Sequence, residues 1–146
     1  MLNELYRTKV KTPLWPVEFF IEAYRQGIGK FLLVKHEGKV IGGSMVVVSD
    51  GECVYEWFEC GQNAEYKEQY PSVMATWAGI NYAHEHGCTR YDMMGAGEPG
   101  VPYGVRDFKS EFGGELVEHG RFLCVMRPFL YRIGVGCVKL LKYRSK

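Results

Sequence analysis

Lys109 is the residue of this sequence best suited to chemistry, because it lies between two aromatic residues in the segment Phe108-Lys109-Ser110-Glu111-Phe112. A lysine ammonium binds phosphates, and it stabilises the oxyanion that develops when an amine attacks an ester. Phe108 and Phe112 stand at the spacing of neighbours on one helix face, so they also anchor the helix in the core. A lysine on the surface of a short helix is the alternative.

Asp92 is the second catalytic candidate, because it ends a short predicted strand just before a glycine-rich segment. A carboxylate at that place can accept a proton or orient an amine. It can instead cap the turn that follows. Tyr103 and Arg106 stand at the exit of the glycine-rich segment, where they can hold a phosphate or a peptide carboxylate, or simply pack the loop. With Glu98 and Phe108 they make up the predicted substrate-binding set.

The segment from Gly95 to Gly104 is predicted to be a substrate loop. It contains the pattern Gly-x-Gly-x-x-Gly in Gly95-Ala96-Gly97-Glu98-Pro99-Gly100. A dinucleotide site needs this pattern between a strand and a long helix. Here no long helix follows at once, and two prolines interrupt the segment, so we do not expect a dinucleotide cofactor.

Helices and strands that position these residues follow from the apolar pattern. Apolar residues at helical spacing predict helices near residues 2–10, 17–24, 71–86, 105–112 and 130–141. Strands are predicted at 31–34, 40–48, 53–60, 89–93 and 116–126, with a tight turn at Ser49-Asp50-Gly51. The first three strands should form an antiparallel meander.

This order of elements predicts the fold class. Hairpin-linked strands followed by a helix that crosses over to later strands are best buried in a mixed sheet with helices on both faces. We therefore predict an α/β chain with an α+β type of mixed sheet, forming a single domain over residues 1–146.

Two stretches carry a resemblance to a known family. The first runs from Tyr70-Pro71-Ser72-Val73-Met74 through Gly79 to Tyr91-Asp92, and the second is Asp107-Phe108-Lys109-Ser110-Glu111-Phe112-Gly113-Gly114-Glu115. They resemble the FemAB family, which shows an aromatic helix, a strand that ends in an aromatic-Asp pair, a glycine-rich loop and then Phe-Lys-x-x-Phe-Gly-Gly. The resemblance extends from Lys11-Thr12-Pro13-Leu14 to Glu115.

The resemblance implies a GNAT-like fold and an acyltransferase. FemAB proteins have two such halves and transfer an amino acid from aminoacyl-tRNA to the peptide of a peptidoglycan precursor, without a cofactor. This chain has about half their length, so the resemblance implies the C-terminal half and makes the N-terminal half a partner. It also implies that Lys109 helps to hold or stabilise the donor, with aminoacyl-tRNA and the cell-wall precursor as substrates.

GNAT enzymes that use acetyl-CoA hold its pyrophosphate on a glycine-rich turn before the central helix. The corresponding segment here, Gly61 to Tyr70, lacks spaced glycines and contains Glu65 and Glu68, which would repel an anion. Acetyl-CoA is therefore not the expected donor. Two alternatives stay open: an N-acyltransferase that depends on CoA or a carrier protein, and a non-catalytic half-domain that binds RNA or a partner.

The charge of the chain is unevenly distributed. The net charge is +1, yet residues 121–146 contain seven basic and no acidic residues. Arg132, Lys139 and Lys142 lie beside an apolar stripe of the last predicted helix. Such a face can meet an anionic membrane or RNA phosphates, or be solvated. We predict a cytoplasmic protein, because there is no signal-peptide pattern at the start and no long apolar run. No residue pattern predicts a metal site.

Overall fold

The computed structural model describes residues 1–10, 12–49, 51–120 and 122–144, and the chain divides into two compact units, Met1–Gly113 and Gly114–Lys146. Lys11 of the resemblance, Asp50 of the predicted turn and Arg121 of the last predicted strand lie outside the described residues. The first unit contains α1 (Leu2–Leu5), α2 (Val17–Arg25), β1 (Gly29–His36), β2 (Lys39–Ser49), β3 (Cys53–Gly61), α3 (Pro71–Glu85), β4 (Arg90–Asp92) and α4 (Gly104–Ser110), and the second contains α5 (Pro128–Arg144).

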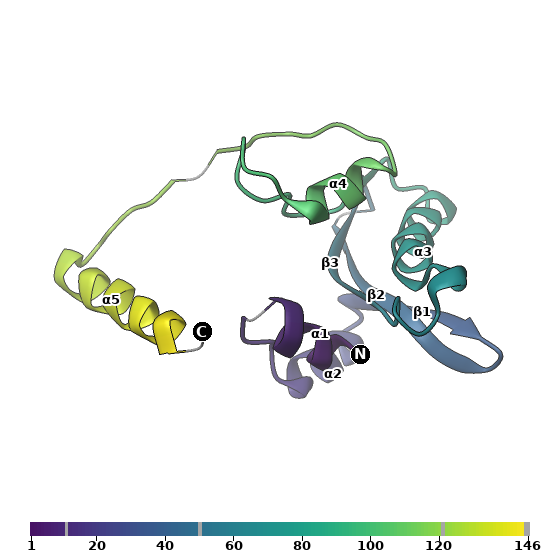
Figure 1. Ribbon diagram of the computed structural model, residues 1–146. Coiled ribbons are helices and arrows are strands. Elements are labelled where there is room, and N and C mark those ends of the chain that lie inside the picture. Colours follow the sequence, from purple (N-terminus) through teal and green to yellow (C-terminus); the bar gives the residue numbers. More distant parts are fainter. Residues whose placement is uncertain (11, 50, 121, 145–146) are drawn as a thin grey trace. The chain divides into compact units, whose positions relative to one another are not determined.

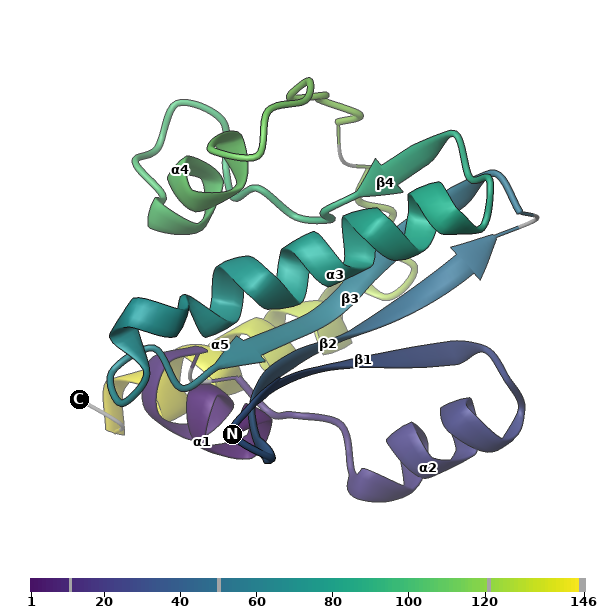
Figure 2. The ribbon, with the colours of Figure 1, turned by 90° about the vertical axis from the view of Figure 1, so that its right-hand side faces the viewer.

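The sheet of the first unit has four strands in the order β1-β2-β3-β4. The first three are antiparallel, and β4 runs parallel to β3. Parallel neighbours need a crossover connection, and α3 supplies it (Figure 2). The predicted meander and the predicted mixed α/β sheet are confirmed.

Helices cover both faces of this sheet (Figure 1). On one face, Val46 and Val54 form the buried core with Ala83 of α3. On the other face, the ring of Phe20 in α2 contacts the ring of Phe58 in β3, with 5.0 Å between their centroids. The central strand β2 is buried continuously from Ile41 to Val46, as expected of a strand covered on both sides.

The prediction of a last strand at residues 116–126 is wrong. Residues 114–120 and 122–126 have no regular secondary structure. Most of the apolar residues there are exposed, among them Leu116 at 61% and Leu123 at 72%. A strand needs a neighbour that accepts its hydrogen bonds, and an apolar sequence pattern does not supply one.

The final predicted helix is confirmed as α5, in the second unit. In the part of the chain that the structure describes, no helix is both long and apolar enough to cross a bilayer.

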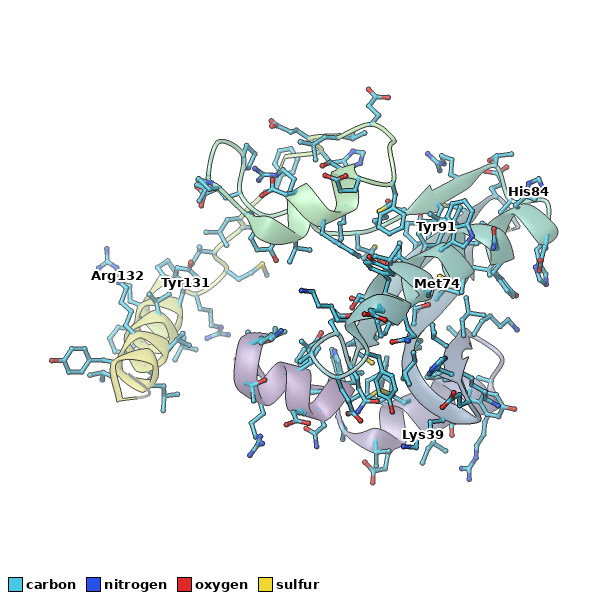
Figure 3. All side chains as sticks on the ribbon, turned by 45° about the vertical axis from the view of Figure 1, so that its right-hand side comes forward. Lys39, Met74, His84, Tyr91, Tyr131 and Arg132 are labelled. Atoms are coloured by element: carbon cyan, nitrogen blue, oxygen red, sulfur yellow. The ribbon has the colours of Figure 1, made fainter. Side chains whose placement is uncertain are left out.

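Close packing between α3 and β4 depends on one glycine. A Cβ atom built on Gly79 would lie 2.2 Å from the hydroxyl of Tyr91 and 2.7 Å from its ring. Figure 3 shows Tyr91 directed toward α3. The absence of a side chain at Gly79 therefore lets this tyrosine lie directly on the helix.

We predict that Gly79→Ala lowers the free energy of unfolding of the first unit by about 1–3 kcal/mol, because the added methyl group overpacks the contact with Tyr91. Urea unfolding followed by circular dichroism measures this. Gly104→Ala is the control, because no atom lies within 4 Å of a Cβ built there. Equal stability of the Gly79 variant and the native chain would contradict the packing.

Candidate functional site

Lys109 binds the start of the glycine-rich loop. It lies near the end of α4, and its Nζ donates hydrogen bonds to the carbonyl oxygens of Met93 and Gly95, the latter at 2.9 Å. The side chain is half-buried. An ammonium has three N–H donors, so these two bonds leave one donor for another acceptor.

Arg106 binds the rest of the same loop. Its guanidinium donates to the carbonyl oxygens of Ala96 at 2.9 Å, Val101 at 3.0 Å and Glu98 at 2.5 Å. These bonds match the loop-packing alternative for Arg106. A role of Arg106 in substrate binding stays a prediction.

Tyr103 and Glu98 belong to the same loop. Tyr103 precedes the first residue of α4, and its ring lies over Gly97, where an added Cβ would come within 2.6 Å of Tyr103 Cδ1. Gly97 also has φ +79°, a conformation that favours glycine. Glu98 is exposed, and its carbonyl oxygen accepts the bond from Arg106.

Phe108 of α4 packs against an aromatic residue that follows the end of this helix. Its ring lies 5.3 Å from that of Phe112 in an edge-to-face arrangement. The structure thus brings four predicted residues, Tyr103, Arg106, Phe108 and Lys109, to α4 and the residue before it. A direct role of Phe108 toward a substrate stays a prediction.

Asp92 caps the turn that follows β4. Its Oδ1 accepts a hydrogen bond of 2.6 Å from the backbone N–H of Met94, a residue with φ 60°. Asp92 also attracts the ammonium of Lys109 and acts to raise the pKa of that lysine. The carboxylate therefore supports the loop in this structure, and its predicted role in proton transfer stays a prediction.

Sequence reasoning missed two glutamates of β3. The register between β2 and β3 shifts so that Met45 pairs with Phe58 and Val46 with Glu56, which leaves Trp57 as an extra residue in β3. Without this β-bulge, residues three apart would face opposite sides of the sheet. With it, Glu56 and Glu59 both lie on the side that α3 covers.

Glu56 is held by two hydroxyl groups. Its side chain is buried, with 7% of the residue exposed. Its Oε1 accepts hydrogen bonds from Thr76 of α3 at 2.9 Å and from Tyr91 of β4 at 3.0 Å. Desolvation raises the pKa of Glu56, and the two hydroxyl groups and Lys109 oppose that rise.

Glu59 is less well satisfied. Its Oε1 is buried and has no hydrogen-bond partner among the described residues. Desolvation raises the pKa of Glu59 to about 7, the carboxylate of Glu56 adds to the rise, and Ser72 and Lys109 oppose it. Glu59 can therefore exchange a proton near neutral pH.

Glu56, Glu59 and Lys109 form a charge cluster in the sense that both glutamates attract the lysine, although in the part of the chain that the structure describes no ion pair within 4.0 Å joins Lys109 to either glutamate. Desolvation lowers the pKa of Lys109, whereas Glu56, Asp92 and Glu59 act to raise it. Lys109 thus binds the loop and is at the same time attracted by the two carboxylates. Among the described residues no three His, Cys, Asp or Glu side chains gather as metal ligands would.

The cluster lies where β3 extends beyond its parallel neighbour. Only Cys53, Val54 and Tyr55 pair with β4, and β4 ends at Asp92. From Glu56 to Gly61, β3 continues past this end. The side of β3 toward the glycine-rich loop is therefore not paired with a strand in this stretch of the described chain.

A cavity of about 160 Å³ lies against the same strand. Its walls are mostly apolar and include Phe20, Phe31, Met45, Phe58 and Glu59. Most of these side chains belong to the sheet face that α1 and α2 cover, so this cavity and the charge cluster lie mainly on opposite faces of β3.

Because the pKa of Glu59 is raised in the folded chain, the free energy of unfolding should depend on pH. The folded-state pKa of about 7 lies above the ordinary value of 4.5. This group therefore contributes its full stabilisation below about pH 4.5 and loses it as the pH rises through 7. Glu59→Gln, which imitates the protonated acid, should be more stable than the native chain at pH 8, by on the order of 2 kcal/mol, and should lose that advantage toward pH 5.

Urea unfolding at a series of pH values measures this difference. Glu52→Gln is the matched control, because the side chain of Glu52 is exposed and lies just before β3. A Glu59→Gln variant whose stability differs from that of the native chain by the same amount at every pH would contradict the raised pKa.

Comparison with known proteins gives one match. The model of the FemAB family matches residues 23–137, which is most of the chain and includes β1 to β4, α3 and α4. No curated protein and no solved structure matches the chain.

Proposed function

Because this chain belongs to the FemAB family, we propose that it acts as an aminoacyltransferase, carrying an amino acid from aminoacyl-tRNA to the peptide of a cell-wall precursor. The observation that carries the proposal is the place of Lys109. It belongs to the Phe-Lys-x-x-Phe-Gly-Gly segment, and its ammonium binds the glycine-rich loop while the charges of Glu56 and Glu59 attract it.

The proposed reaction joins an acceptor amine to the carbonyl carbon of an aminoacyl ester. Negative charge develops on the carbonyl oxygen during the attack, and a donor already fixed in place stabilises it. Two N–H groups of Lys109 are held by Met93 and Gly95. They fix the direction of the third, which we assign to the ester oxygen.

The donor site is proposed to be shaped, through the loop and α4, by Glu98, Tyr103, Arg106 and Phe108. Arg106 binds three loop carbonyls, so it acts on the substrate by fixing the loop. The resemblance to two-lobed proteins adds a first lobe, which would complete the cleft around this cluster. Aminoacyl-tRNA and the precursor peptide are the proposed substrates.

A CoA-dependent acyltransferase is the alternative, and the start of α3 argues against it. A pyrophosphate would need free N–H groups at this helix end. Pro71 has no N–H, and the N–H of Ser72 already donates to Oδ1 of Asn63 at 3.1 Å. Tight binding of CoA would favour this alternative, and RNA binding without turnover would favour a non-catalytic half-domain.

Lys109→Ala should lower the rate of amino acid transfer about 10²–10³-fold, because it removes one donor to the oxyanion. A transfer assay with charged tRNA and a pentapeptide precursor, supplemented with the first lobe if the chain alone is inactive, measures the rate. Lys67→Ala, an exposed lysine before α3, is the control. Transfer at the native rate by a folded Lys109→Ala chain would contradict the role of Lys109.

We also propose that α5 contacts an anionic membrane surface. It leaves Leu130, Ile133, Leu140 and Leu141 exposed, from 49% to 67%, at the spacing of one helix face. Arg132 and Lys139 lie on the opposite side by the same periodicity, and Figure 3 labels Arg132 on this helix. The side chain of Lys142 lies outside the described residues. A basic amphipathic helix without acidic residues suits anionic lipid.

Sedimentation with vesicles tests this contact. The chain should bind vesicles that contain phosphatidylglycerol and not vesicles of phosphatidylcholine alone. Lys139→Glu should weaken binding more than tenfold, because each basic residue near the surface contributes about 1 kcal/mol. Lys67→Glu in the first unit is the control. Equal binding to both kinds of vesicle, or binding to RNA alone, would contradict a membrane role for α5.

A further inference from the structure

We propose that Glu59 is the proton acceptor of the transfer reaction, taking the proton that the acceptor amine loses and passing it to the leaving oxygen. This inference rests on the proposed function and names a residue for it that the sequence motifs do not include. It stands on the position of Glu59 beyond the end of β4, on the same side of β3 as Glu56, and on its unpartnered carboxyl oxygen.

The reaction requires such a group. The amine nitrogen forms a bond to the ester carbonyl carbon, and the bond from that carbon to the ribose oxygen breaks. The nitrogen must lose a proton, and the leaving oxygen must gain one. A single carboxylate that takes the first proton and gives it to the oxygen balances both steps without another reactant.

Glu59 suits this role better than the other two carboxylates whose charges act on Lys109. Oε1 of Glu56 already accepts bonds from Thr76 and Tyr91. Oδ1 of Asp92 accepts the bond from Met94 N–H that holds the turn. Oε1 of Glu59 has no partner among the described residues. A buried oxygen without a donor is costly, and an N–H from a bound amine would supply one.

The surroundings of Glu59 also bring its pKa close to neutral pH, where it can transfer a proton. Burial raises its pKa to about 7; the Glu56 carboxylate on the same strand adds to the rise, whereas Ser72 of α3 and Lys109 of α4 oppose it. Tyr91 of β4 donates a hydrogen bond to the neighbouring Glu56. A base works best when its pKa lies close to the working pH.

The β-bulge explains how one short strand presents both glutamates to α3. Trp57 is the extra residue, so Val46 pairs with Glu56 and Ser44 with Glu59. The hydroxyl of Ser44 donates to the carbonyl oxygen of Ala75 at 3.0 Å. Ser44 is thereby occupied by α3, and the residue opposite Glu59 does not take its free oxygen.

The pH profile of kcat tests the inference. In the native chain, kcat should rise with pH through about 7, where Glu59 loses its proton. Glu59→Gln should lower kcat about 10²–10⁴-fold, change KM little and abolish that rise. Glu59→Asp, which keeps a carboxylate, should recover part of kcat. Glu52→Gln should match the native chain in all three respects.

Carbon-13 NMR of the glutamate carboxyl groups supplies a readout that does not need turnover. One resonance should titrate near pH 7 and be missing in folded Glu59→Gln. A chain that transfers amino acids while Glu59→Gln keeps its kcat and its pH profile would overturn the role of Glu59 and leave the proposed function intact. A resonance of Glu59 that stays ionised at pH 5 would overturn it too. Absence of transfer under all conditions would instead count against the proposed function.

Discussion

The burial of Glu56 and of one carboxyl oxygen of the half-buried Glu59 on the α3 side of the sheet is the constraint on which much of the first unit depends, because a carboxyl group removed from water must find donors or keep its proton. Thr76 and Tyr91 supply donors to Glu56 from α3 and β4. The side chain of Tyr91 can reach that position only because α3 has a glycine at residue 79. The crossover from β3 through α3 to β4 therefore both builds the sheet and satisfies one of its two buried acids.

The charges of these carboxyl groups also act on Lys109, which binds the glycine-rich loop. Its ammonium is attracted by the charges of the carboxyl groups, and it binds the carbonyl oxygens of Met93 and Gly95. Arg106, one helical turn earlier, binds three further carbonyls of the same loop. Both cations of α4 thus organise the backbone that leaves β4. In the proposed reaction, Lys109 responds to the protonation state of Glu56 and Glu59, and it also fixes the shape of the substrate loop.

Much of this arrangement could be predicted from the sequence, and the rest depends on contacts that a sequence pattern does not contain. The meander, α3, the loop and α4 followed from apolar periodicity and from glycine and proline positions. The Phe-Lys-x-x-Phe-Gly-Gly segment led to Lys109 and to the family. The two glutamates were missed, although charges inside the apolar run Cys53–Gly61 were a visible signal. Glu56 and Glu59 lie on the same side of the sheet because of the β-bulge at Trp57, and this bulge is visible only in the pairing of β3 with β2.

The strand wrongly predicted at residues 116–126 also shows that contacts absent from a sequence pattern decide the structure. Its apolar residues matched a strand, but strand formation depends on a neighbouring edge that the local sequence does not specify. For Asp92, the sequence predicted two alternative roles. Its position after a strand fitted both a base and a turn cap, and the bond from Met94 N–H shows the cap.

The most direct test of the central claim is a calorimetric titration of this chain, in native form and as Lys109→Ala, with charged tRNA, a pentapeptide precursor and acetyl-CoA. The account predicts that the native chain binds the charged tRNA or the precursor, that Lys109→Ala weakens that binding, and that acetyl-CoA gives no heat. Tight binding of acetyl-CoA, or binding of the tRNA and precursor that Lys109→Ala leaves unchanged, would contradict it.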